Sequence, residues 1–111
     1  MKEIPLPLAV PLFTQSVTLE GKDLVLRFDY NGREDRWYLD VRDEAGELVV
    51  GAVKVRCGQD LLAKARARAV LEGFLVALDL AGTPASPGAP PGYADLGRRV
   101  RLFYLEPSEL P

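Results

Sequence analysis

Three aspartates are the residues of this sequence whose types and spacing could support acid–base chemistry. Asp29, Asp40 and Asp43 fall on or beside strand-like segments, and two carboxylates held close together can act as general acid and general base. The alternative is that all three are solvated charges on the outer face of a sheet, where Arg27 and Arg42 would face them from neighbouring strands. We favour this second interpretation.

The composition gives little support for nucleophilic catalysis or for metal binding. The 111 residues include no histidine, which excludes Ser-His, Cys-His and His-metal arrangements. The only cysteine, Cys57, has no neighbouring histidine or turn signal that would lower its pKa, so we interpret it as a plain small residue. No P-loop and no Gly-x-Gly-x-x-Gly motif occurs. The sequence therefore predicts no catalytic residue, no bound metal and no cofactor.

Basic and aromatic side chains could instead contact nucleic acid. Two basic clusters occur in the second half of the chain: Lys64, Arg66 and Arg68, then Arg98, Arg99 and Arg101. Such groups contact phosphates, while aromatic rings stack on bases in small barrels that bind single strands. The formal net charge of −2 argues instead for solvated strand ends and salt bridges. Trp37 and Tyr38 could form a ligand platform, but a Trp that alternates with Leu39 and Val41 is typical of a core.

The elements that would position these residues are short strands. Alternation of apolar and polar residues, with turn signals between the segments, predicts six of them: 13–20, 23–30, 36–43, 48–55, 74–80 and 100–105. Gly21-Lys22 and Asn31-Gly32 supply turns for hairpins. Since no βαβ alternation and no repeat is present, we expect an all-β fold, a small antiparallel barrel or sandwich of about six strands.

The remaining segments complete one domain over residues 1–111, with an arm at 1–12, a β domain at 13–105 and a frayed tail at 106–111. Prolines in the arm exclude a helix and a central strand there. Residues 56–72 contain good helix formers, yet their basic residues are spaced by two, so a short helix and an irregular crossover both remain open. Residues 81–92 are a Pro/Gly-rich loop by composition.

The arm is the best candidate for contact with a partner. Its apolar side chains would be an aggregation liability if left exposed, so they are expected to be buried either on this domain or on another protein. The candidate contact residues are Ile4, Leu6, Leu8 and Leu12. Glu3 and the lack of a basic n-region argue against a signal peptide, and no apolar run approaches the ~18 residues of a membrane span.

Several short motifs follow one another in an order that is informative. The chain opens with Ile4-Pro5-Leu6 and with a strand that ends in Val17-Thr18-Leu19-Glu20-Gly21. Trp37-Tyr38-Leu39-Asp40, an acidic turn at 43–46 and Asp60-Leu61-Leu62 follow. The chain closes with Asp95-Leu96-Gly97 and an aromatic-ending strand. Over nearly its whole length the sequence resembles the phage baseplate plug family of contractile-tailed bacteriophages and prophages. Residues 63–71 and the Pro-rich loop depart from that pattern.

The resemblance implies a non-enzymatic structural component of a bacteriophage tail baseplate, a plug near the central hub and the tube mouth. It implies a location in the virion tail baseplate after synthesis in the bacterial host cytoplasm. The implied partners are the baseplate hub and other tail proteins, with a homo-oligomer left open, no membrane, and nucleic acid not expected. Two alternatives from other classes stay open: a small barrel that binds single-stranded nucleic acid, and a barrel that binds a small ligand.

Overall fold

The structure, a computed structural model, describes residues 2–8, 10–62, 71–80, 88, 90–106 and 108, and within these it contains seven strands and no α-helix. The strands are β1 (Lys2–Ile4), β2 (Leu12–Leu19), β3 (Lys22–Asn31), β4 (Arg36–Asp43), β5 (Leu48–Lys54), β6 (Phe74–Asp79) and β7 (Val100–Leu105). They form a four-stranded antiparallel sheet in the order β2-β3-β4-β5 and a three-stranded antiparallel sheet in the order β1-β7-β6.

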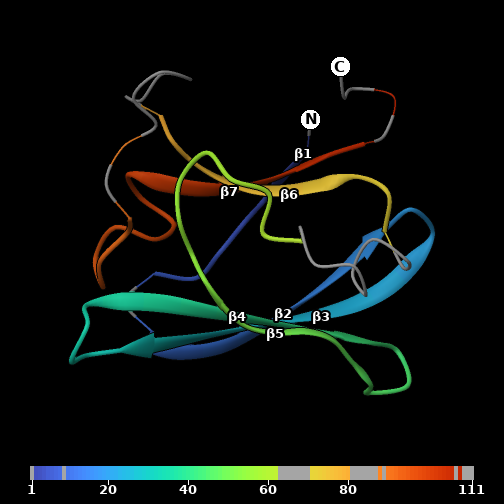
Figure 1. Cartoon of the computed structure of the whole chain (residues 1–111), viewed down its shortest axis with the longest axis horizontal. Coiled ribbons are helices and arrows are strands. Elements are labelled where there is room, and N and C mark those ends of the chain that lie inside the picture. Colours follow the sequence, from blue (N-terminus) through green and yellow to red (C-terminus); the bar gives the residue numbers. More distant parts are fainter. Residues whose placement is uncertain are drawn as a thin grey trace.

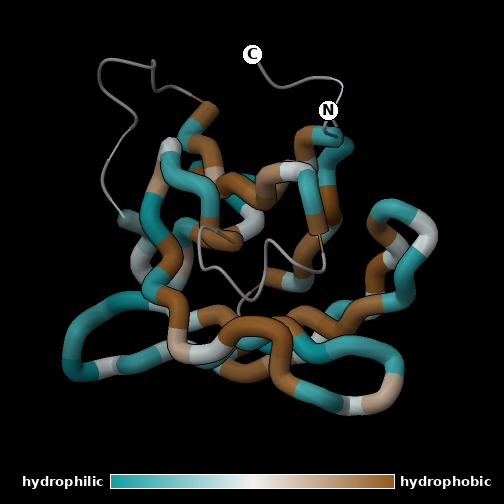
Figure 2. The backbone as a smooth tube through the Cα atoms, turned by 45° about the vertical axis from the view of Figure 1, so that its right-hand side comes forward, coloured by the Kyte–Doolittle hydropathy of each residue, from teal (hydrophilic) through white to brown (hydrophobic). Residues whose placement is uncertain are grey.

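The two sheets form two layers, one above the other (Figure 1). Side chains from both layers meet in one buried cluster, which includes Phe28 and Leu39 from the larger sheet and Leu75 and Leu102 from the smaller one. The polar hairpin ends project beyond the layers and are teal in Figure 2. The prediction of an all-β fold is confirmed, and of the two architectures left open the sandwich is the one present.

Alternation along the strands places the expected side chains in the core. Leu24, Leu26 and Phe28 are buried along β3, and Leu39 is buried on β4. Trp37, also on β4, is only 2% exposed, so the prediction that it belongs to the core is confirmed. The predicted ranges of β4 and β7 agree with the structure, those of β5 and β6 differ by one residue at one end, and those of β2 and β3 differ by one residue at each end.

The first residues of the predicted extended arm form a strand that was not predicted from the sequence. Lys2–Ile4 forms β1, which pairs in antiparallel register with β7 from Lys2 opposite Tyr104 to Ile4 opposite Leu102. The described residues therefore form one more strand than predicted. Pro5 follows directly, and β1 stands at a sheet edge, which is where a proline can be tolerated beside a strand.

The connection after β5 is an irregular crossover as far as the structure describes it. Cys57 forms a parallel bridge with Ala77, and Asp60 an antiparallel bridge with Val76, so this segment runs along β6. Residues 63–70, which hold the first predicted basic cluster, lie outside the described residues, as do most of the predicted loop and tail.

Candidate partner-binding surface

The structure separates the four candidate contact residues into two pairs. Ile4 is 3% exposed and belongs to the protein's own core, and Leu6 is partly buried against that core. Leu8 and Leu12, by contrast, are 45% and 49% exposed. The segment around Leu8 runs directly over the turn before β7, because a Cβ atom on Gly97 would come within 2.8 Å of the Leu8 Cδ2 atom. The base of the N-terminal segment is thus fixed on the domain, Leu8 lies against Gly97 with part of its side chain exposed, and Leu12 is exposed.

Val10 is a third exposed apolar side chain of this segment, and sequence reasoning did not single it out. The available signal was only that Val10 is an apolar residue between Leu8 and Leu12 in the sequence. We call these three residues the exposed N-terminal segment. Leu12 begins β2 and lies opposite Asp29 in the sheet, so the segment ends at the outer face of the four-stranded sheet.

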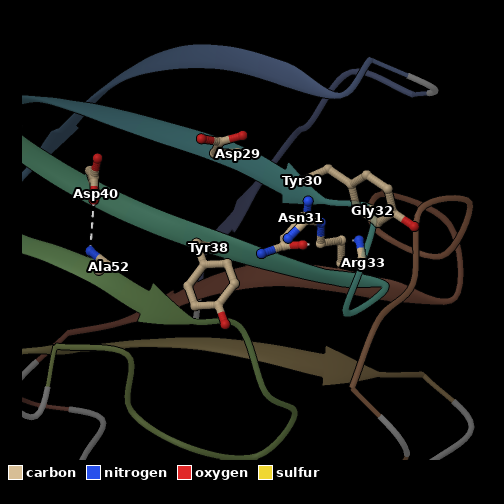
Figure 3. Close-up of a pocket in the computed structure, with 8 residues that line it drawn as sticks. All are labelled: Asp29, Tyr30, Asn31, Gly32, Arg33, Tyr38, Asp40 and Ala52. Atoms are coloured by element: carbon tan, nitrogen blue, oxygen red, sulfur yellow. Dashed lines mark hydrogen bonds between the residues drawn. The ribbon is translucent and has the colours of Figure 1, made fainter.

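A polar depression of about 820 Å³ lies on that outer face, next to Leu12 in the sheet register (Figure 3). Its lining comes from β3, β4, β5 and the turn between β3 and β4: Asp29, Tyr30, Asn31, Gly32, Arg33, Tyr38, Asp40 and Ala52. Two carboxylates, a guanidinium and the phenol ring of Tyr38 are among these groups, whereas the Tyr30 ring packs on the inner side against Trp37 and Tyr93, so the depression suits polar contacts with a protein surface.

Asp40 supports the backbone of the sheet. Ala52 has a positive φ of 54° in a β-bulge of β5, and its N–H donates a 2.8 Å hydrogen bond to Asp40 Oδ1, drawn as a dashed line in Figure 3. Asp40 stands opposite Arg27 in the register, as predicted. Asp43 similarly accepts hydrogen bonds from the backbone N–H groups of Ala45 and Glu47 in the next turn. The contacts of Asp40 and Asp43 thus favour structural roles.

Arg42 does not pair with an aspartate as expected. Its guanidinium donates to the carbonyl oxygen of Gly46 at 3.0 Å, and its neighbour across the sheet is Val25. The turn at 44–47 follows β4 directly, so its carbonyl oxygen at Gly46 is within reach of the Arg42 guanidinium.

Tyr38, Glu34 and Lys54 form a hydrogen-bonded group on the outer face. The Tyr38 hydroxyl donates to Glu34 Oε1 at 2.6 Å, and Lys54 Nζ lies 3.2 Å from Glu34 Oε2. The hydrogen bond to Glu34 raises the pKa of the Tyr38 hydroxyl, and the same bond, followed by that from Lys54, lowers the pKa of the Glu34 carboxyl. The tyrosine therefore stays neutral and donates from this surface at neutral pH.

In the second basic cluster, Arg99 and Arg101 form ion pairs with acidic side chains of the same chain. Arg99 forms ion pairs with Asp79 at 2.6 Å and with Asp95 at 3.2 Å, and Arg101 lies 3.5 Å from Glu3. The hydrogen bonds to Asp95 and then Asp79 raise the pKa of the Arg99 guanidinium, so its charge is permanent. These pairings follow the interpretation of the cluster as salt-bridged and disfavour a phosphate-binding role.

Cys57 is buried, and its burial raises the pKa of the thiol, which keeps it protonated. A buried, protonated thiol behaves as a small apolar residue, as the sequence suggested. Among the residues that the structure describes, no group of three His, Cys, Asp or Glu side chains is arranged to hold a metal ion. In the same described ranges, no helix is long and apolar enough to cross a membrane.

A packed β-sandwich with an exposed apolar segment beside a polar depression defines a protein that is suited to contact with other proteins. Comparison with known families then identifies the family of the protein. Residues 1–107 match the family described as cyanophage baseplate Pam3 plug gp18, and the chain belongs to this family. No curated protein matches the chain. The resemblance to phage baseplate plugs is thereby confirmed. The protein is a structural component of a phage tail baseplate, where it contacts other baseplate or tail proteins.

Proposed function

We propose that this protein is the plug of its baseplate, seated near the central hub and the mouth of the tail tube, and that it acts by shape and contact without catalysis. The match of residues 1–107 to a baseplate plug family is the observation that carries this proposal. The protein is made in the cytoplasm of the bacterial host and enters the virion during tail assembly.

The exposed N-terminal segment is the proposed contact with the hub or a neighbouring tail protein. Burial of a leucine side chain contributes about 1.5–3 kcal/mol, so burial of Leu8 and Leu12 on a partner would supply a large share of an assembly contact. Both are at least 45% exposed in the isolated chain. The polar depression beside Leu12 would supply the rim of the same contact, since interfaces combine an apolar centre with a polar surround.

Ile4 and Leu6 have a supporting role in this proposal. The pairing of β1 with β7 and the burial of Ile4 hold the start of the segment in place. Contact residues that lie close to a fixed strand lose less conformational freedom when they bind, which favours affinity. Of the four residues singled out from the sequence, Leu8 and Leu12 are therefore the proposed contacts, and Ile4 and Leu6 are the proposed anchors.

The test is mass spectrometry of purified tails from wild-type phage and from phage that lack the gene, complemented with variants. Tails from wild-type phage should contain the protein, and deletion should abolish infectious particles. The double variant Leu8→Ser/Leu12→Ser should fold yet be depleted from tails. Leu48→Ser is the matched control, because Leu48 is also exposed but lies on β5, and it should be incorporated normally. Absence of the protein from wild-type tails would reject the proposal.

A further inference from the structure

The four outer strands of the two sheets differ in how their free edges are protected. An edge strand presents unpaired N–H and C=O groups, and proteins usually block such edges with short strands, charges, bulges, prolines or covering segments. The outer strands here are β2 and β5 in the larger sheet and β1 and β6 in the smaller one.

Three of these edges carry a recognisable protection. β1 has only three residues, of which Lys2 and Glu3 are charged. The edge of β6 is covered by the crossover segment, since Gly58 N donates to Ala77 O at 2.9 Å and Leu61 N to Leu75 O at 2.7 Å. β5 contains the bulge at Ala52 and ends in a lysine.

As far as the described residues show, β2 carries none of these protections. Its eight residues, Leu-Phe-Thr-Gln-Ser-Val-Thr-Leu, include no charge and no proline. Its register with β3 runs without a bulge from Leu12 opposite Asp29 to Leu19 opposite Lys22. Within the described ranges of the chain, no strand or bridge pairs with its other side.

The hydrogen-bonding pattern identifies which backbone groups are open. Tyr30 N donates to Pro11 O at 2.9 Å, which marks residues 11 and 30 as a hydrogen-bonded pair. Because such pairs alternate with non-hydrogen-bonded pairs along an antiparallel ladder, the residues that bond to β3 are the odd-numbered ones. Thr14, Ser16 and Thr18 therefore direct their N–H and C=O groups away from the sheet.

We propose that β2 is the site at which a second copy of this chain adds, strand to strand and antiparallel, to form a symmetric dimer with one continuous eight-stranded sheet. A strand that pairs with itself across a twofold axis places even-numbered residues opposite even-numbered ones. Since β2 has no charged residue, this arrangement opposes no like charges, which would otherwise destabilise cross-strand pairs.

The number of open edges also favours a second copy. Among the strands of the described residues one edge is unprotected, and it is used up when two molecules pair, so assembly through it closes at two and leaves none of these edges open to continue a fibre. The proposal does not depend on the plug assignment, because it concerns the purified protein. Failure of the dimer proposal can be distinguished from failure of the plug proposal. Incorporation into tails tests the plug proposal, and the mass of the protein in solution tests the dimer proposal.

The experiment compares the full chain with variants by sedimentation and amide hydrogen exchange. The wild-type protein should have twice the 12.2 kDa mass of one chain. Ser16→Lys should reduce the mass to that of a monomer by opposing two ammonium groups near the axis. Ser16→Pro should do the same by removing an outward N–H, and it breaks no hydrogen bond to β3. Leu48→Lys, which adds the same charge at the opposite edge of the sheet, should remain a dimer.

Hydrogen exchange on the wild-type protein makes the test independent of the folding of any variant. The amides of Thr14, Ser16 and Thr18 should be protected at least ~10-fold more at high concentration than in a dilute monomeric sample, whereas the exchange of β3 amides should change little. A wild-type monomer at concentrations up to roughly 1 mM would overturn the proposal. So would a dimer in which these three amides exchange as in the monomer, or one that Leu48→Lys dissociates equally.

Discussion

The hydroxyl of Tyr104, on β7 of the smaller sheet, donates a hydrogen bond to the carboxylate of Glu20, in the turn between β2 and β3 of the larger sheet. The same carboxylate accepts hydrogen bonds from the backbone N–H groups of Glu72 at 3.1 Å and Gly73 at 3.0 Å. Glu20 has a positive φ of 54° in a two-residue turn with Gly21, which directs its side chain toward the other sheet. One carboxylate thus joins both layers.

Removal of this tyrosine hydroxyl should destabilise the protein. Tyr104 is buried, and a hydrogen bond to a charged group contributes about 1.5–3 kcal/mol, so Tyr104→Phe should lower the free energy of unfolding by about that amount. Urea denaturation measures it. Tyr38→Phe is the matched control, since it removes an exposed hydroxyl that also bonds to a glutamate, and it should change stability little. Equal losses of unfolding free energy in both variants would contradict the conclusion that the hydrogen bond from Tyr104 to Glu20 stabilises the protein.

The stability of the protein should fall in acid, partly through Glu20. Burial raises the pKa of this carboxyl, but the hydrogen bonds from Tyr104, Gly73 and Glu72 outweigh burial, and the pKa in the folded state lies below the ordinary value of 4.5. A carboxyl whose pKa is lowered on folding stabilises fully above its unfolded-state pKa, and that contribution is lost as the pH falls through the folded-state pKa.

Asp95 contributes to the same loss of stability in acid, because the hydrogen bond from Arg99 lowers the pKa of its carboxyl in the folded state. The free energy of unfolding, measured by urea titration from neutral pH to below pH ~4, should decrease toward acid. Glu20→Gln should flatten the profile in this range. An unchanged slope in that variant would show that other carboxylates account for the acid sensitivity.

Gly73 should tolerate no side chain. A Cβ atom there would collide with the hydroxyl of Tyr104 and with the backbone carbonyl oxygen of Leu105, which cannot move aside as a flexible side chain can. Gly73→Ala should therefore cost about 1–3 kcal/mol or more, the range for overpacking a core, measured by chemical denaturation. Gly32→Ala serves as control, because its Cβ would meet only the Tyr30 ring at 3.8 Å and should be accepted.

Trp37→Ala should cost about 3–5 kcal/mol, as for other large aromatic side chains removed from a core. The indole packs parallel to the Tyr93 ring, with centroids 6.2 Å apart, and its Nε1–H donates to Gly92 O at 2.9 Å. Tyr93→Ala should cost less, since Tyr93 is only partly buried. Thermal and urea unfolding give both values, and a loss below ~1 kcal/mol for Trp37→Ala would place the ring at the surface after all.

The strands of the larger sheet were predictable because their side chains alternate and their turns are short. β1 was not, since three residues followed by a proline carry no measurable period and pair with β7 at the far end of the chain. The buried end of the predicted loop at 81–92 was not predictable either: Pro91 and Gly92 are buried, and the hydrogen bond from Trp37 to Gly92 spans 55 positions. A contact between residues so far apart in the sequence produces no local pattern from which it could be predicted.

The candidate surface was predictable only in outline. The sequence identified the apolar N-terminal residues, but whether Ile4 or Leu8 is buried depends on which strand each one meets, and that is a property of the assembled sheets. The aspartates were interpreted as solvated charges on an outer face, and the hydrogen bond that Asp40 accepts from the backbone was hidden, because Ala52 is a non-glycine residue with a positive φ and gives no turn signal.

The pairing of β1 with β7 also sets an order in which the chain can fold. β2 to β5 are joined by consecutive hairpins, so the larger sheet can form as soon as residue 54 has left the ribosome. The smaller sheet needs the first and the last strands together, and contacts between such distant parts form slowly because a long loop must close. Until Val100–Leu105 has been synthesised, Ile4 has no strand to pair with, and a nascent or truncated chain exposes it to chaperones and proteases.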